Sequence, residues 1–455
     1  MGLFRTPLEG AERATCPCIG ETNDMLSAPA KEKDMYRIAG IDVHKELLVV
    51  VIAELRADGI AILERRKFWA RPEQMRKLAE RLLEWEVEEV VMESTAQYWQ
   101  PVRGMLEEVW QPVRQQRKGA GAKAGNLYLA QAQSNKGRRG RKNDYEDVKR
   151  LVAGELVLSF VPEAEQRLWR TVTRRKNQLN KDRSRVQSQL ECVLEQAHIK
   201  LASVISDLLG VSAVRILRAI AEGKSDPVVL AGLVEKNVKA TPEQLADALS
   251  AVRRCKADYR KLIQMMLDHV KLLDEQVDQL LLHAARLMKA HEDAVNRLAE
   301  VPGLGVDSGL QIVAEVGPQA EVFPTAGSLC SWVGAIPGEQ VSADKNASSK
   351  SPKGNRQMRR VLTEAVEAAI KQKGNIFEVK FRKFIAHMDY QEAIWCVVHF
   401  MCKLVWKILH DGVRYEERGP GVDALLAWAS VLGGSVTSKL RGSAYCPRSH
   451  GCLPN

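Results

Sequence analysis

The segment Leu47–Ala53 reads Leu-Leu-Val-Val-Val-Ile-Ala, and it limits the possible folds more than any other stretch. Its β-branched side chains favour a strand. Within residues 36–56 another strand and a small interruption precede it, and the turn Ala57-Asp58-Gly59 returns the chain as a hairpin over 60–68. The chain therefore opens with adjacent strands of one sheet.

The next segments add helices and a further strand. An amphipathic helix is predicted from Arg71 to Trp85, with Pro72 in its first turn. A short buried strand, 89–92, ends at Glu93, and another helix follows Pro101. The order of three strands, helix, strand and helix predicts a ribonuclease-H-like α/β domain, a mixed sheet with helices on its faces.

Four acidic residues stand where such a fold could gather them. Asp42 ends the first strand and Glu93 ends the later one, while Asp144 and Asp147 are three apart on one face of a predicted helix. Carboxylates are hard oxygen ligands that suit Mg²⁺, and two such ions can clamp the oxygens of a phosphodiester. The alternative is structural: strand-end turns, an N-cap at Asp144 and a first-turn acid at Asp147.

Basic residues are clustered along the chain, whose formal net charge is +10. Residues 113–143 form a glycine-interleaved basic arm, and a strongly basic helix is predicted over 162–198. This distribution favours a nucleic-acid partner, although a linker and a solvated helix face would have the same composition. The candidate nucleic-acid contacts in these two segments are Arg138, Arg139, Arg141, Lys142, Arg174 and Arg175.

The middle of the chain is helical by pattern. Short helices over 200–250 are broken by Gly223 and by Asp226-Pro227, and Thr241 is placed to cap one of them. A longer helix is predicted over 251–300, with two apolar series at seven-residue steps. They are Ile263, Val270, Val277, Ala284 and Met266, Leu273, Leu280, Leu287. This seam predicts a coiled coil, either with the basic helix of the same chain or with a second subunit.

The turn Val301–Gly305 precedes a helix predicted over 306–316. Its Pro-Gly-Leu-Gly sequence resembles the hairpin of helix–hairpin–helix DNA binders, whose backbone N–H groups can hold a phosphate. A tight connection between helices would need the same glycines.

A loop rich in small residues then leads into a basic helix that opens after Pro352. A serine of this loop could attack phosphorus, with Lys353, Arg356 or Arg359 stabilising the developing charge. Chemistry alone does not choose among the serines of this stretch, which are Ser331, Ser342, Ser348, Ser349 and Ser351. The alternative is a hydroxyl-rich surface loop without a catalytic role. One or two further helices are predicted over 375–411.

Several motifs, in one order, resemble the DEDD-type transposases of insertion-sequence family one-ten. They are Gly40–Lys45, Met92–Val102, Gly140–Asp147, Val301–Gly305, Trp332–Gly334 and Lys353–Asn355 with Arg359-Arg360. The resemblance runs from about 36 to 410. Two positions depart from the family pattern, because Ala96 stands where glycine is common and Asn143 where threonine is common.

The resemblance implies a RuvC-like N-terminal domain, whose Asp42, Glu93, Asp144 and Asp147 bind Mg²⁺, and a C-terminal domain with a catalytic serine. Counting about ten residues from Trp332 indicates Ser342, although the loop after it lacks the usual serine–glycine doublet. It further implies a phosphoserine intermediate, a structured guide RNA, and a homo-oligomer whose composite site takes acids from one subunit and serine from another.

The expected organisation is a disordered lead-in over 1–35, the RuvC-like domain over 36–160, a helical and coiled-coil region over 161–297, the serine-containing domain over 298–411 and a tail over 412–455. Nine scattered cysteines without a CxxC pair indicate free thiols in a reducing cytoplasm. For a transposase of the family that the chain resembles, the expected location is the bacterial cytoplasm, at the nucleoid. No apolar run or signal-peptide pattern indicates a membrane.

Three functions fit these observations. The first is a transposase that cleaves and rejoins DNA with Mg²⁺ and a serine. The second is a junction endonuclease that uses the acids alone, with water as nucleophile. The third is a nucleic-acid-binding protein without catalysis, against which the presence of all four acids argues.

Overall fold

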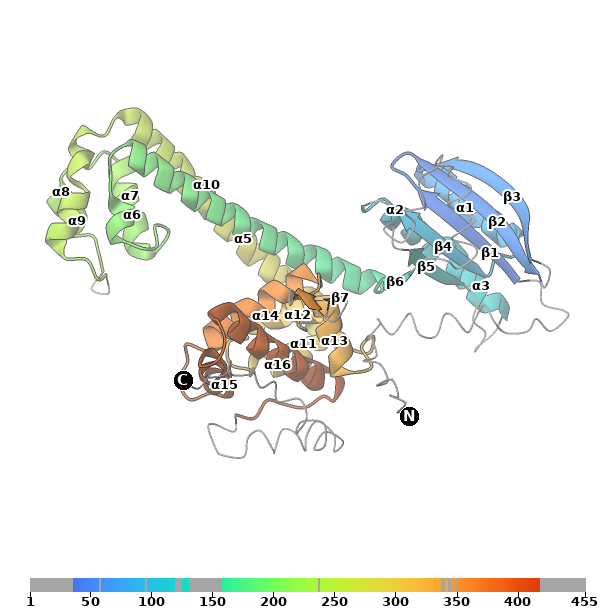
Figure 1. Cartoon of the computed structure of the whole chain (residues 1–455). Helices are drawn as coiled ribbons and strands as arrows, with labels where there is room; N and C mark the ends of the chain where they lie inside the picture. Colours follow the sequence, from blue (N-terminus) through green and yellow to red (C-terminus); the bar gives the residue numbers. More distant parts are fainter. Residues whose placement is uncertain are drawn as a thin grey trace, which may run out of the picture. The chain divides into compact units, whose positions relative to one another are not determined.

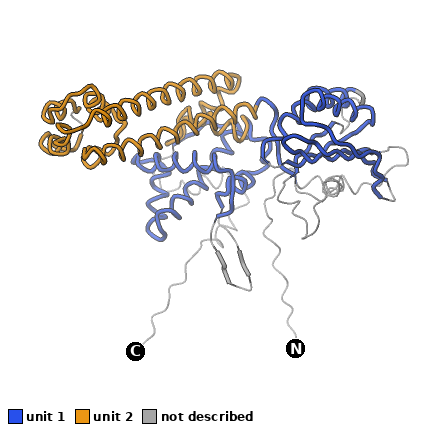
Figure 2. Tube along the Cα trace, turned by 90° about the horizontal axis from the view of Figure 1, so that it is seen from above, with its two compact units in different colours: residues 1–165, 319–455 blue, residues 166–318 orange. Residues whose placement is uncertain are grey.

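The computed structural model describes residues 36–56, 59–94, 96–118, 125–130, 158–235, 238–336 and 351–417, together with the backbone of 340–342 and 345–348 (Figure 1). The chain divides into two compact units, 166–318 and the combination of 1–165 with 319–455 (Figure 2). Segments 131–157 and 418–455, with the predicted Asp144 helix and the basic arm from 131 on, lie outside the described residues.

A mixed sheet forms the N-terminal part, as the strand pattern predicts. Its strands are β1 (Tyr36–Val43), β2 (Leu47–Arg56), β3 (Gly59–Trp69), β4 (Glu89–Ser94), β5 (Asn126–Ala130) and β6 (Leu158–Ser159). They lie in the order β3-β2-β1-β4-β5-β6. β1 pairs in parallel with β4, and β4 with β5, while the other pairs are antiparallel. The order is consistent with a DEDD nuclease fold.

Burial on both faces explains the unbroken apolar run of β2. Leu48, Val50 and Ile52 belong to a cluster with the helices that follow β3, whereas Val49 and Val51 belong to a cluster on the opposite face. The helices are α1 (Pro72–Glu84), α2 (Trp99–Met105), the π-helical turn η1 (Leu106–Trp110) and α3 (Gln111–Lys118). Alternate side chains of a strand point to opposite faces, so a strand covered on both sides needs apolar residues throughout.

Two long helices, α5 (Ala164–Gln196) and α10 (Ala257–Leu287), form the core of unit 166–318. At one end they are joined by α6 (Leu201–Val204), α7 (Val211–Ala221), α8 (Pro227–Ala231), α9 (Pro242–Ala248) and the 3₁₀ turn η2 (Ser250–Arg254). All of these share one hydrophobic cluster with α5 and α10. Thr241 caps α9 in a capping box with Gln244, as the sequence indicates.

The predicted helix over 251–300 is interrupted, which corrects its expected length. α10 ends at Leu287, and a 3₁₀ turn η3 (Lys289–His291) separates it from α11 (Glu292–Ala299). α10 has 31 residues and α5 has 33, so α5 is the longer. Ile263, Val270 and Leu273 of the apolar series are buried in the cluster shared with α5. Part of the seam is therefore occupied within the chain.

Unit 166–318 ends with α12 (Val306–Val316), the helix predicted after the Pro-Gly-Leu-Gly turn. The C-terminal part then comprises α13 (Ala326–Val333), β7 (Gln340–Ser342), β8 (Lys345–Ser348), α14 (Arg356–Ala369), α15 (Ile376–Ile385) and α16 (Tyr390–His410). By length and composition α16 could span a membrane, but it contacts α13, α14 and α15 and buries Val397, Val398 and Met401 completely. It is packed as a core helix.

Candidate active site: an acid pair and a clamped serine hairpin

Asp42 and Glu93 are brought together by strand pairing. The parallel register of β1 and β4 places Asp42 directly opposite Glu93. Neighbouring strands lie about 4.8 Å apart, and directly opposed residues of a parallel pair project from the same face. The sequence places both acids at strand ends, and this register makes them adjacent.

The surroundings of Asp42 restrict its carboxylate. Only 8% of the residue is exposed, and Nε2 of His44 lies 3.1 Å from its Oδ2. His44, which is not among the site residues predicted from the sequence, is therefore in contact with the predicted site. The signal for it was its position two residues after Asp42, just beyond the end of the strand.

This acid pair is suited in chemistry to a divalent cation, because carboxylates are hard oxygen ligands. Two carboxylates do not complete a coordination shell, and within the described ranges no three His, Cys, Asp or Glu side chains converge to hold a metal. The prediction assigns the missing ligands to Asp144 and Asp147, which lie outside those ranges.

The second candidate element is the loop between α13 and α14. Its two ends meet at Gly334 and Gly354, whose backbones are in direct contact. A Cβ atom on Gly354 would lie 2.1 Å from the carbonyl oxygen of Val333 and 2.4 Å from N of Gly334. Gly334 itself has φ +75, a left-handed conformation that glycine adopts without strain. These glycines explain why the Trp-Val-Gly and Lys-Gly-Asn motifs occur together.

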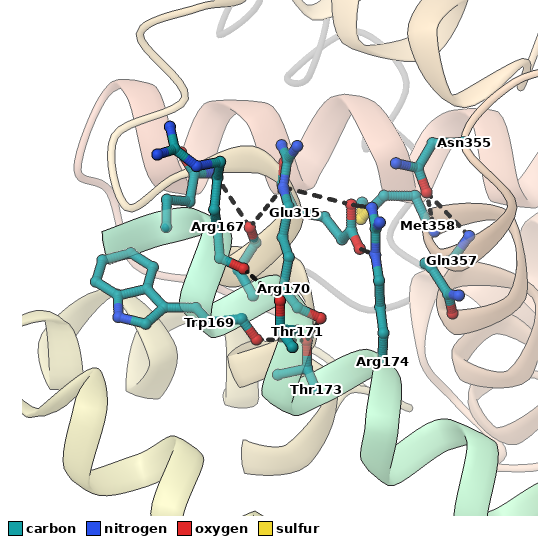
Figure 3. A network of polar contacts seen from close by, with 12 residues as sticks. Arg167, Trp169, Arg170, Thr171, Thr173, Arg174, Glu315, Asn355, Gln357 and Met358 are labelled. Atoms are coloured by element: carbon teal, nitrogen blue, oxygen red, sulfur yellow. Dashed lines mark hydrogen bonds and ion pairs between the residues drawn. The ribbon is translucent and has the colours of Figure 1, made fainter. Parts of the chain in front are cut away.

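Hydrogen bonds hold the same junction. The backbone N–H of Asn355 donates to the carbonyl of Trp332 at 3.0 Å. The Asn355 side chain caps α14 by accepting from the backbone N–H groups of Gln357 and Met358 (Figure 3). The first turn of α14 is thereby oriented by the end of α13.

Ser342 lies on the β7–β8 hairpin, in the segment between α13 and α14. β7 and β8 pair antiparallel, with Ser342 opposite Lys345. Lys353 and Arg356, beside the junction, are exposed, whereas Arg359 is half-buried. The Nη1 of Arg359 donates to the carbonyls of Gly334, at 2.8 Å, and Pro352, at 3.3 Å.

Arg174 of α5 has a structural contact that the sequence does not reveal. Its Nε and Nη2 donate to the two carboxylate oxygens of Glu315 at 2.7 and 2.8 Å, and Glu315 is 2% exposed (Figure 3). The hydrogen bonds to Glu315 raise the pKa of Arg174. Arg175, the neighbouring candidate, is exposed.

Arg170 completes this network at the C-terminal end of α12. It donates to the backbone carbonyls of Ala314 and Glu315. Burial lowers the pKa of Arg170 to about 10, although the nearby Glu315 carboxylate opposes the shift. Arg170 satisfies carbonyls that a helix end leaves without partners, and Arg174 binds the carboxylate of the same helix, so part of the basic face of α5 is used to pack α12.

The sheet with its acid pair is followed in the chain by a helical part that carries the β7–β8 hairpin. Two family models match in the same order: the DEDD transposase model of the IS110 family over residues 39–199, and the model described as Transposase IS116/IS110/IS902 family over 295–381. The chain carries both domains of the IS110 family and is an insertion-sequence transposase. Comparison with curated proteins gives no match.

Proposed function

We propose that this transposase cleaves and rejoins DNA through a covalent serine intermediate, with Mg²⁺ held by the acids. The observation that carries the metal half is the register of Asp42 against Glu93. The observation that supports the serine half is the clamped junction beneath the β7–β8 hairpin. Asp144 and Asp147 complete the proposed acidic set.

In the proposed reaction the Oγ of Ser342 attacks the phosphorus of a phosphodiester. The Oγ–P bond forms and one deoxyribose O–P bond breaks, while the serine proton passes to solvent and the departing oxygen takes one up. A hydroxyl of the exchanged strand then attacks the phosphoserine, which reseals the DNA and frees Ser342. Mg²⁺ bound by the acids would neutralise charge developing on the phosphate oxygens.

The basic segments supply the proposed contacts with nucleic acid. We assign backbone contacts to Arg138, Arg139, Arg141, Lys142, Arg175, Lys353 and Arg356, because phosphate contacts position a nucleic acid without reading its sequence. A structured RNA transcribed from the flanks of the gene is the proposed guide. The proposed assembly is a cytoplasmic homo-oligomer in which one subunit's serine works with another's acids.

The test compares Ser342→Ala with Ser348→Ala. Each full-length protein is purified from cells that also transcribe both flanks of the gene, then incubated with Mg²⁺ and a duplex bearing one flank. Denaturing gels of the wild type and Ser348→Ala are expected to show protein attached to DNA, and Ser342→Ala none. Cleavage that persists in Ser342→Ala without an adduct would instead identify an endonuclease that uses water.

A further inference from the structure

We propose that Arg359 is a positioning residue that locks the base of the serine hairpin, and does not contact nucleic acid. The inference rests on the proposed function, in which a serine of this hairpin attacks phosphorus. It also revises the expectation from sequence that Arg359 stabilises charge at the phosphate.

The hydrogen bonds of Arg359 join the two ends of the loop. One nitrogen of its guanidinium contacts the carbonyl of Gly334, where α13 ends, and that of Pro352, where α14 approaches. One side chain thus connects backbone atoms that are 18 positions apart in the sequence. The hairpin lies between these two anchor points.

The aromatic ring of Trp395 supports the guanidinium from α16. Cζ of Arg359 lies 4.1 Å from the ring centroid, within the range of a cation–π contact. Burial lowers the pKa of Arg359, in keeping with a charge that is partly withdrawn from water. The ring covers one face of the guanidinium and Nη1 donates to both carbonyls, so these contacts fix the side chain in one place beside the junction. Lysine has neither the planar face nor the fork of donors.

The close backbone contact explains why a side-chain lock is needed. The N of Gly354 is 3.0 Å from a Cβ built on Gly334. The two backbone segments therefore touch with no side chain between them. The guanidinium of Arg359 links the two segments through the carbonyls of Gly334 and Pro352. Displacing a nucleophile by about 1 Å can lower a rate about 100-fold, so a loosened base is expected to affect the chemical step.

The exposed residues Lys353 and Arg356 provide the contrast. They flank the same junction and stand in solvent. If they bind the phosphate backbone, their loss weakens DNA binding and leaves the reaction of bound DNA unchanged. Loss of Arg359 is expected to lower the reaction rate of bound DNA and to leave DNA binding unchanged. Separate measurement of binding and of the maximal rate distinguishes these roles.

The experiment measures the rate of protein–DNA adduct formation against duplex concentration, with the co-purified RNA and Mg²⁺ present. Arg359→Ala is expected to lower the maximal rate about 100-fold and to leave the half-saturating duplex concentration within about twofold. Added methylguanidinium is expected to restore part of the rate by occupying the vacated place above Trp395. Arg356→Ala is expected to raise the half-saturating concentration and keep the maximal rate.

The inference is overturned if Arg359→Ala weakens DNA binding at an unchanged maximal rate, or if methylguanidinium restores nothing to a variant that melts at the wild-type temperature. A wild type that forms no adduct would contradict the proposed function instead. The lock is then tested by hydrogen exchange in β7 and β8, which Arg359→Ala is expected to accelerate and Arg359→Lys to accelerate less. Unchanged exchange would overturn it.

Discussion

Gly354 touches the carbonyl of Val333 so closely that no other amino acid fits there. An added Cβ would stand 2.1 Å from that oxygen and 2.2 Å from its carbon, both backbone atoms. A flexible side chain could move aside, but this segment is the end of α13, held by its own helix and by the bond from Asn355 to Trp332. The contact therefore acts as a steric lock beneath the hairpin.

Gly354→Ala is expected to separate α13 from the start of α14 and to lower the free energy of unfolding by about 2–4 kcal/mol. Denaturant titration of the full chain would measure the loss. The matched control is Gly327→Ala in α13, where the nearest described atom to the new Cβ is 3.6 Å away, and it should stabilise the chain by up to about 1 kcal/mol because alanine favours a helix over glycine. Equal effects of the two variants would contradict the steric lock.

Glu315 and Arg174 provide a second stability test. Glu315→Gln leaves the largely buried Arg170 and the exposed Arg174 facing a neutral amide, and is expected to cost about 1.5–3 kcal/mol, the usual contribution of hydrogen bonds to a charged group. Glu275→Gln, which removes an exposed partner of Lys271 at 3.9 Å, should cost less than about 0.5 kcal/mol. Both are measured by denaturant unfolding of unit 166–318 in the whole chain.

Much of the sheet was predictable because local chemistry decides it. A β-branched run, a turn at 57–59 and strand-ending acids require no knowledge of distant residues. The adjacency of Asp42 and Glu93 was an expectation of the fold, but the register that makes it direct depends on how β1 meets β4. Strand register is determined by the packing of whole faces, which a short motif does not contain.

The features that the sequence does not show come from contacts over long separations. Arg174 is predicted as a nucleic-acid contact, and the Glu315 carboxylate to which it donates lies 141 positions away. The end of α10 has no glycine or proline to announce it. Met288, which follows Leu287, is 1% exposed, and His291 packs edge-on against Trp169 at 5.1 Å. Tertiary packing therefore ends that helix against its local propensity.

Asp42→Asn is expected to have opposite effects on activity and on metal-free stability. Removing one carboxylate relieves repulsion with Glu93, so the melting temperature without metal should rise. The further stabilisation that Mg²⁺ gives the wild type should disappear. The rate of cleavage should fall by more than about 10–100-fold, which is the usual effect of losing a residue that only supports a metal ligand. Thermal unfolding with and without Mg²⁺ measures the two changes in stability, and a DNA-cleavage assay measures the activity.

The control for this variant is Glu46→Gln, at an exposed position on the turn between β1 and β2. It removes one acid from the same neighbourhood, so it corrects for a change of net charge. If it abolished the Mg²⁺-dependent stabilisation as completely as Asp42→Asn, the assignment of Asp42 as a ligand would be wrong.

His44→Ala tests whether orientation of the Asp42 carboxylate matters to the metal. The variant removes the contact at 3.1 Å and keeps both acids, so it is expected to raise the Mg²⁺ concentration for half-maximal stabilisation about tenfold. Lys45→Ala, at the exposed neighbouring position, should leave that concentration unchanged. The same value for both variants would show that His44 has no orienting role.

Ala96 occupies a left-handed backbone conformation, with φ 73. An L-residue with a Cβ is strained there by about 1–2 kcal/mol, whereas glycine is not, which accounts for the glycine common at this position in the family pattern. Ala96→Gly is therefore expected to stabilise the chain by about 0.5–1 kcal/mol, after its greater unfolded-state entropy is subtracted. The matched control is Ala285→Gly on the exposed face of α10, where the helix makes the same substitution cost about 1 kcal/mol. If Ala96→Gly destabilised the chain as Ala285→Gly does, the strain at Ala96 would be smaller than the entropy cost of glycine.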